Sequence, residues 1–408
     1  MKRSLLTLLA LAFCLSACAP AAPAPQSEAP ARATAETAGT VEENETTISP
    51  VEGALRNMKD CENTGKALYR WQLEAQPDGS PELGKLVEVG YATAQQRVVQ
   101  DTGIPTYRLR SCYARGNTAY YVESAKDSLT LHIVDLTDGT EKTMPVVEDY
   151  STGFLDDRYL YLFVASPTGY STMQRVDPET GTDEMIPLPG QALEICDGAD
   201  GRFLITRLIG QVSLSGLEDA EQRSAALQTA AVEYAWWDPV DGSVEPLFQE
   251  PYTGELSESG WPQERVYLGR ADGKFYFYRA EQAETGRINC RVERCAPDGS
   301  GTETVLALED GQGQPFVYKA GGEIQWLVRG IGSTAIEVYQ TADSSTRRVE
   351  TPSGNNVALP RALTDDGRVL MFGPDSNGPE KPTYRLVRQE DYLAGNFTGT
   401  DVGPLGEE

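Results

Sequence analysis

The sequence has a single histidine, His132, among 408 residues, and after residue 18 it has no long apolar run. One histidine excludes zinc sites built from several histidines and mechanisms that need a histidine pair. The missing apolar runs exclude a polytopic membrane protein. Basic residues are also few, with 35 Lys and Arg against 61 Asp and Glu, and the net charge of −26 repels phosphate backbones. Nucleic acid is therefore a poor candidate partner.

The motifs of common catalytic machinery are missing as well. The chain has no Gly-x-Ser-x-Gly elbow, no Walker loop and no histidine pair of the zinc-protease type. His132 falls within an expected strand, residues 129–134, where a cross-strand or solvent-facing position is favoured over a catalytic one. We therefore expect no metal site and no cofactor, no residue stands out as catalytic, and a non-enzymatic role is favoured.

The N-terminus carries an export signal. Lys2 and Arg3 precede an apolar run, residues 5–15, that is too short to span a bilayer as a stable helix. The following Leu-Ser-Ala-Cys, residues 15–18, resembles the lipobox of bacterial lipoproteins, in which the cysteine is acylated before the signal is removed. The resemblance implies a signal peptide over residues 1–17 and lipidation of Cys18, which would anchor the protein to the bacterial cell membrane. The alternative, an ordinary secretory signal, also places the chain outside the cytoplasm.

Residues 18–50 are expected to be a tether that follows the lipidated cysteine. Positions 19–50 contain nine alanines, five prolines and no aromatic residue. Such a composition buries too little apolar surface to offset the entropy lost on ordering. We therefore expect a disordered tether over residues 18–50 and a folded domain over residues 51–408.

The body of the chain reads as a series of short strands separated by tight turns. The clearest repeat is an Asp-Gly turn, a basic residue and then strand-forming residues, as in residues 200–205, 272–277 and 366–371. Looser copies extend the series, and the equivalent positions are Gly65, Asn117, Asp157, Gly201, Gly273, Gly322 and Gly367. Five of the six spacings lie between 40 and 52 residues, which is the period of four-stranded propeller blades. The sixth spacing is 72 residues. The prediction is an all-β β-propeller, with seven blades favoured and six or eight as alternatives.

A second turn follows four of these positions, at residues 135–139, 177–181, 238–242 and 298–299. These paired turns resemble the repeats of TolB-like periplasmic propellers, and the resemblance implies the propeller fold over about 300 residues. The association of that family with an envelope complex is not expected here, because TolB-like proteins are usually soluble, whereas the N-terminus of this chain resembles that of a lipoprotein.

The long fourth repeat is explained by insertions. Residues 215–218 read as a capping box, and the apolar spacing that follows predicts a short helical insertion over residues 216–231 in blade four. A second irregular stretch runs from Pro251 to Pro262. Insertions in repeat proteins often build the binding face. Three aromatic residues flank this region, Trp236, Trp237 and Trp261, and they are the candidate binding residues. Since neighbouring strand residues point to opposite faces, one of Trp236 and Trp237 is expected in the core.

The cysteines offer little chemistry. Cys290 and Cys295 lie in one expected strand, about 16 Å apart, which is too far for a disulfide. Cys61 and Cys112 hold similar positions in adjacent repeats, so a disulfide between them is an alternative to buried thiols.

Together these features predict a lipid-anchored, extracytoplasmic propeller that acts as a non-catalytic binding or scaffold module for an envelope protein or glycan. The alternative is a carbohydrate-active enzyme or glycan-binding propeller that uses carboxylates in the central funnel. A third reading, an assembly factor for a surface complex, predicts a stable protein partner.

Overall fold

The computed structural model divides the chain into two compact units, residues 1–45 and 46–408. It describes residues 56–57, 62–76, 80–126, 128–147, 150–156, 158–166, 169–209, 230–252, 265–282, 285–308, 313–331, 335–350, 359–375 and 378–405, all in the second unit. The regular secondary structure of the described residues is nearly all strand, with two short helices, η1 (Thr106–Arg108) and α2 (Gln389–Leu393). No helix among them is long and apolar enough to cross a membrane.

Strands pair antiparallel with their neighbours along the chain, and five sheets in the described residues have four strands each. Group 1 comprises β2 (Glu62–Asn63), β3 (Ala67–Glu74), β4 (Leu83–Gly90) and β5 (Gln95–Pro105). Group 2 comprises β6 (Leu109–Arg115), β7 (Thr118–Ser124), β8 (Leu129–Asp135) and β9 (Glu141–Val146). Group 5 comprises β17 (Arg265–Ala271), β18 (Lys274–Gln282), β19 (Ile288–Cys295) and β20 (Glu303–Leu308). Group 6 comprises β21 (Phe316–Ala320), β22 (Glu323–Ile331), β23 (Ala335–Gln340) and β24 (Ser345–Glu350). Group 7 comprises β25 (Pro360–Leu363), β26 (Arg368–Asp375), β27 (Gly378–Arg388) and β28 (Thr400–Asp401).

One sheet has eight strands because a long strand belongs to two groups. Its members are β1 (Arg56–Asn57), β10 (Tyr150–Leu155), β11 (Leu160–Ser166), β12 (Gly169–Asp177), β13 (Thr182–Ala199), β14 (Arg202–Ile209), β15 (Ala231–Trp237) and β16 (Val244–Pro251). Residues 182–187 and Ala192 of β13 pair with β12, and residues 191–199 pair with β14. Group 3 therefore ends, and group 4 begins, within β13. The described strands therefore form seven groups. The number of blades in the propeller remains a prediction from the spacing of the sequence repeat.

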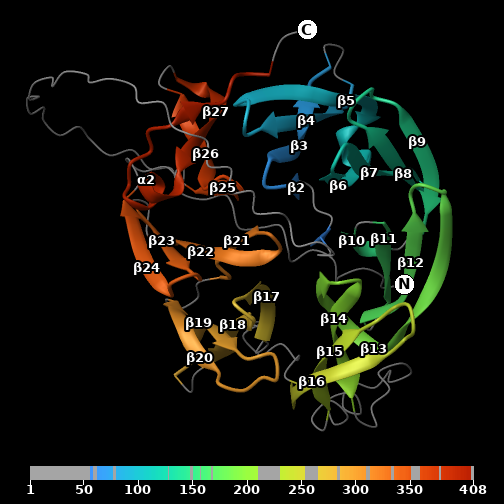
Figure 1. Cartoon of the computed structure of the whole chain (residues 1–408), viewed down its shortest axis with the longest axis vertical. Helices are drawn as coiled ribbons and strands as arrows, with labels where there is room; N and C mark the ends of the chain where they lie inside the picture. The colour runs from blue at the N-terminus through green and yellow to red at the C-terminus, as the bar shows by residue number, and fades with distance from the viewer. Residues whose placement is uncertain are drawn as a thin grey trace, which may run out of the picture. The chain divides into compact units, whose positions relative to one another are not determined.

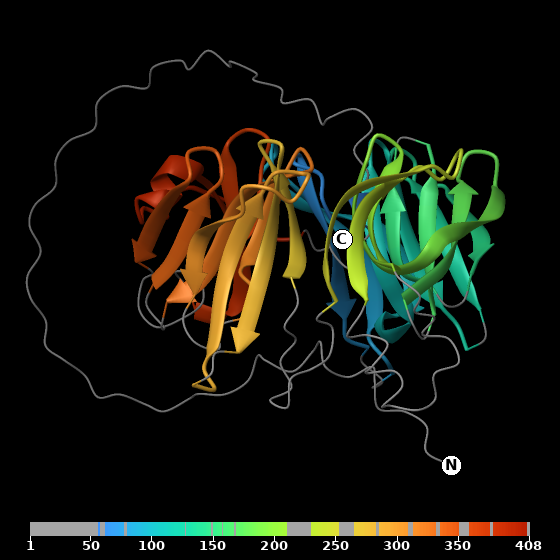
Figure 2. The ribbon, with the colours of Figure 1, turned by 90° about the horizontal axis from the view of Figure 1, so that it is seen from below.

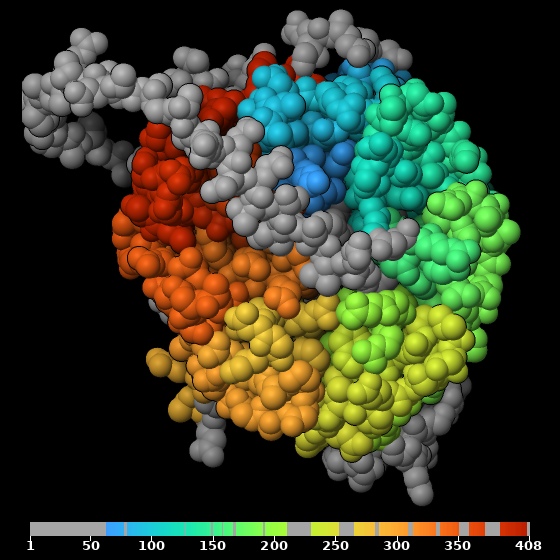
Figure 3. All heavy atoms as spheres, viewed as in Figure 1, coloured from blue at the N-terminus to red at the C-terminus, as the bar shows by residue number. Residues whose placement is uncertain are grey.

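The groups follow one another in chain order around a common axis (Figure 1). The first strand of each group lies nearest the axis, and β1 adds to the inner edge of β10. Figure 2 shows the sheets from the side, and the space-filling view in Figure 3 shows the groups as successive sectors of one face. This arrangement is the predicted β-propeller.

The repeat detected in the sequence is the turn between the first and second strands of a group. Asp200 and Gly201 have φ of 51° and 73°, and Asp272 and Gly273 have φ of 48° and 67°. Two consecutive left-handed residues form the hairpin turn that suits the twist of paired strands, which explains the Asp-Gly signature. The second turn of the repeat joins the third and fourth strands; there Gly139 donates its backbone N–H to the carbonyl of Asp135 at 2.8 Å.

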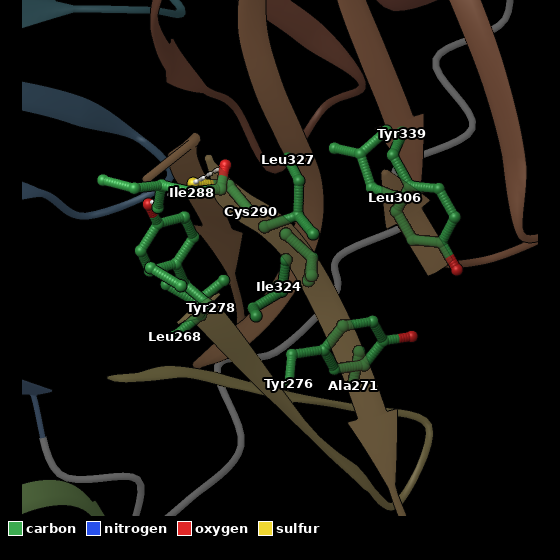
Figure 4. Packing of buried hydrophobic residues seen from close by; sticks show 12 residues of the cluster. Leu268, Ala271, Tyr276, Tyr278, Ile288, Cys290, Leu306, Ile324, Leu327 and Tyr339 are labelled. Atoms are coloured by element: carbon green, nitrogen blue, oxygen red, sulfur yellow. Dashed lines mark hydrogen bonds between the residues drawn. The ribbon is translucent and has the colours of Figure 1, made fainter. Parts of the chain in front are cut away.

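Apolar side chains fill each junction between consecutive groups, and group 7 shares such a cluster with group 1. Figure 4 shows the junction of groups 5 and 6, where Leu268 and Tyr276 of group 5 pack near Ile324 and Leu327 of group 6. Every sheet is thus covered on both faces, which explains why its strands are apolar on both sides rather than alternating.

The ring closes by contact and not by strand exchange, because groups 1 and 7 are each built from consecutive strands. Asn63 donates to the carbonyl of Leu363 at 2.7 Å, and the backbone N–H of Asp365 donates to Gly65 at 2.9 Å. Leu68 and Leu370 lie in the shared apolar cluster. Burial and these hydrogen bonds therefore hold the two ends of the ring together.

The predicted helical insertion lies outside the described residues, except at its end. Ala231 begins β15 and pairs with Ile209, so the helix cannot extend to residue 231 as predicted. The residues that follow, Val232 to Trp237, include several that favour strands, so this segment continues as β15 and not as helix.

Candidate binding face

The propeller has two ends that differ in their connections. The turns within each hairpin repeat lie at one end, which we call the turn end. The strand ends that lead from the second to the third strand, and from one group to the next, lie at the other, which we call the connection end. Ile209, Ala231 and Pro251 are register partners at the connection end of group 4. The strand ends on either side of residues 210–229, and those on either side of residues 253–264, therefore lie at the same end of adjacent groups 4 and 5.

A buried ion pair stands directly beside this point. Arg207 of β14 faces Glu233 of β15, whose side chain is 5 % exposed. The guanidinium Nε of Arg207 donates to Glu233 Oε2 at 2.6 Å, and Gln249 donates to Oε1 at 3.0 Å. Both carboxylate oxygens are satisfied, so the three strands are joined at the connection end by a polar contact with defined geometry.

A second buried network links group 4 to group 5. The Arg265 side chain is 7 % exposed and lies 4.4 Å from the ring centroid of Phe277. Its Nη1 donates to Glu250 of β16 at 3.2 Å, and Glu293 of β19 lies 3.4 Å from its Nε. Burial opposes the charge, but Glu250, Cys295 and Glu293 outweigh it and raise the pKa of Arg265. The arginine therefore stays charged and ties the two groups together where residues 253–264 end.

This network leaves hydrogen-bonding capacity unused. Arg265 Nε and Nη2 and Glu293 Oε2 are buried and have no hydrogen-bond partner. The second oxygen of the same glutamate accepts from Arg291 at 2.5 Å. Such atoms carry a free-energy cost in a folded protein, so the network is held by charge attraction more than by ideal geometry.

The candidate tryptophans do not share one surface. Trp237 is 1 % exposed and packs 6.0 Å from Phe203 in the core between groups 3 and 4. Trp236 faces the junction with group 5 and is half-buried beneath the guanidinium of Arg202, 5.5 Å away. The prediction that the two point to opposite faces is confirmed. Both lie near the turn end, since Trp237 pairs with Val244 at the end of β15. Trp261 and Cys18 lie outside the described residues.

The carboxylates expected near the axis are few. The first strands of the seven groups carry three acidic residues, Glu62, Glu194 and Asp197, within the described structure. Asp197 is buried and accepts hydrogen bonds from the Tyr267 hydroxyl and the Gly198 backbone N–H, both at 2.9 Å. Burial, and then the charge of Asp197, raise the pKa of Tyr267 far above its usual range. This carboxylate is therefore committed to a structural contact.

No protein-family profile matches the chain, and no curated protein matches it. Solved structures do. The propeller domain of the Trilobed protease from Pyrococcus furiosus, described as having an open velcro topology, aligns with a TM-score of 0.51 at 9 % identity over 86 % of this chain and 99 % of that one. A prolyl endopeptidase aligns with a TM-score of 0.50 at 13 % identity over 84 % of this chain and 48 % of that one. TolB from Acinetobacter baumannii aligns at 13 % identity over 75 % and 66 %, with a TM-score of 0.35.

The fold is that of a β-propeller. At such low identity the likeness extends to the fold alone and says nothing about activity. Within the part of the propeller that the structure describes, no group of three His, Cys, Asp or Glu side chains is placed to hold a metal ion.

One polar cluster of the propeller escaped the sequence reasoning. His132 is 7 % exposed, as expected of a cross-strand position, but it bridges two carboxylates, Glu141 through Nδ1 and Glu123 through Nε2 at 3.2 Å. Its ring stacks on Tyr121 with centroids 4.4 Å apart. The two glutamates lie on β7 and β9, the strands on either side of β8, so the bridge becomes visible only once the strand register is known. In the sequence, the only indication of the bridge is that each glutamate lies nine residues from His132.

The cysteines behave largely as expected. Cys290 and Cys295 are buried on β19 and are not disulfide-bonded, which confirms that they do not pair. Cys112 is fully buried. Its predicted alternative partner, Cys61, lies outside the described residues, so that pairing stays a prediction.

Proposed function

We propose that this protein is a lipid-anchored, extracytoplasmic β-propeller that acts as a non-catalytic binding module at the bacterial cell envelope. Its partner-binding face is the connection end of groups 4 and 5. Signal residues 1–17, lipidated Cys18 and a tether through residue 50 hold the module on the membrane.

The observation that carries the proposal is that two long connections, residues 210–229 and 253–264, start from the same end of adjacent groups. The strand ends that carry them are fixed by the Arg207–Glu233 pair and by Arg265. Loops that carry recognition are typically mounted on a scaffold of this rigidity. The carbohydrate-active alternative has no comparable support. Asp197 is held by the Tyr267 hydroxyl, and the described first strands, which lie nearest the axis, carry few other carboxylates.

The test is crosslinking on intact cells with a photoreactive residue introduced at Pro251 or at Val240. Both positions are exposed and both belong to the hairpin of β15 and β16, but Pro251 lies at the connection end and Val240 at the turn end. We expect one stoichiometric protein partner captured from position 251 and not from position 240. Equal capture from both positions would contradict the proposed face, and retention on envelope glycan without a protein partner would favour the carbohydrate reading.

The membrane anchor has its own test. Cys18→Ser removes the acylated sulfur, so we expect the variant to leave the membrane fraction. A variant that stays in the membrane fraction at the level of the unmodified protein would refute lipid anchoring, whatever the outcome of crosslinking.

A further inference from the structure

The direction of β1 shows at which end of the propeller the chain enters. β1 pairs antiparallel with β10, with Arg56 opposite Leu155 and Asn57 opposite Phe154. Leu155 is the last residue of β10, the first strand of group 3, and so lies beside the first turn of that group. Arg56 is therefore nearer to the turn end than Asn57. The chain enters β1 from the turn end and runs toward the connection end.

This point of entry lies close to the axis. β1 adds to the inner edge of β10, and β10 is the strand of group 3 nearest the axis (Figure 1). The next strand, β2, runs the opposite way, from Glu62 toward the turn at Gly65 in group 1. There the Asn63 side chain donates to the Leu363 carbonyl of group 7 at 2.7 Å. The start of the described chain is thus attached to the inner part of the ring, at groups 3 and 1.

The proposed partner face lies at the other end of the strands. β15 has seven residues, so its two ends are about 20 Å apart. Ala231 and its register partner Pro251 lie at the connection end, whereas Val240, in the turn after β15, lies at the turn end. The chain therefore enters the propeller on the side opposite to the partner face.

We infer that the turn end is the end of the propeller nearest the membrane, so that the connection end of groups 4 and 5 faces away from the bilayer. Its partner is then a protein that approaches from the aqueous side, and not one whose contact surface lies at the level of the lipid headgroups. The inference rests on the proposed function, which supplies the lipidated Cys18 and the partner face. A coil with the length of the proposed tether spans about 30 Å, which leaves the propeller room to tilt, so the test includes a shortened tether.

The test measures energy transfer from a fluorescent residue in the propeller to labelled lipids. The full-length chain, purified from bacterial membranes, is placed in phosphatidylcholine vesicles that carry an acceptor dye on their headgroups. The fluorescent residue replaces Val240 at the turn end or, as the matched control in the same hairpin, Pro251 at the connection end; both positions are exposed. A second pair of variants also lacks residues 21–45, which leaves a coil of about 20 Å between Cys18 and Arg56 and restricts tilting.

We expect more transfer from position 240 than from position 251 in both backgrounds, and about twofold more or better with the short tether, because the two positions differ by about 20 Å along the axis. Cys18→Ser should abolish transfer from both positions. Transfer that survives this change would refute the lipid anchor, and with it the proposed function. If Cys18→Ser abolishes transfer but position 251 of the anchored chain transfers as much as position 240, or more, this inference alone is overturned.

Discussion

Replacing Arg207 by leucine should destabilise the propeller far more than the same change at Arg202 on the same strand. Arg207 pairs with Glu233, whose side chain is 5 % exposed, whereas Arg202 pairs with Glu245, whose side chain is 66 % exposed. Arg207→Leu leaves a buried carboxylate without its cation, which typically costs 3–5 kcal/mol. Because Gln249 still holds one oxygen and Arg207 is itself 23 % exposed, we expect the lower end, about 3 kcal/mol.

The control change, Arg202→Leu, breaks an exposed ion pair and should cost less than about 1 kcal/mol. The measurement is thermal unfolding followed by circular dichroism. The entropy of unfolding of a unit of this size is about 0.7 kcal/mol/K, so 3 kcal/mol lowers the melting temperature by about 4 °C. The control should shift it by about 1 °C or less.

A double variant separates the charge from the packing. Adding Glu233→Leu to Arg207→Leu removes the orphaned carboxylate, so most of the lost stability should return, with a coupling free energy of about 2 kcal/mol. The reasoning is refuted if Arg207→Leu costs no more than Arg202→Leu, or if the double variant loses the sum of the two single changes.

Three further changes test other parts of the propeller. Deletion of residues 211–229 joins Ile209 and Ala231, which already pair, through a two-residue Gly210-Ala230 turn, so thermal unfolding should stay cooperative; a broad or absent transition would place this segment in the core. His132→Phe keeps the stacking on Tyr121 but leaves Glu123 and Glu141 without their bridge, so it should cost about 2 kcal/mol in urea unfolding, and much less in a Glu141→Gln background. Burial raises the pKa of Tyr161 and Tyr267 above 10, so the folded state keeps protons that the unfolded state loses; stability should fall as pH rises above about 10, and the phenolate absorbance of these two residues at 295 nm should appear only with unfolding.

The turns could be predicted from the sequence because their chemistry is local. An Asp-Gly pair in left-handed backbone is a property of two residues, and each predicted turn that the structure describes joins two strands of a group, as Gly201 joins β13 to β14. The strand count per group followed from turn spacing alone. The 18-residue strand β13 was missed, because Leu188-Pro189-Gly190 looks like a break, yet the strand passes through it from one group to the next.

The ion pairs could not be predicted, and the reason is the architecture. A charged residue in a strand usually marks a solvent face, but in a propeller both faces of each sheet pack against neighbours. Arg207 and Arg329 therefore need partners, and each finds a glutamate directly opposite on the next strand, Glu233 and Glu337. Arg207 follows its turn glycine by six residues and Arg329 by seven. Position alone does not predict such a pair, since Arg279 also follows its turn glycine, Gly273, by six residues, yet Arg291 lies opposite it and its ion pair is with Glu281 on its own strand.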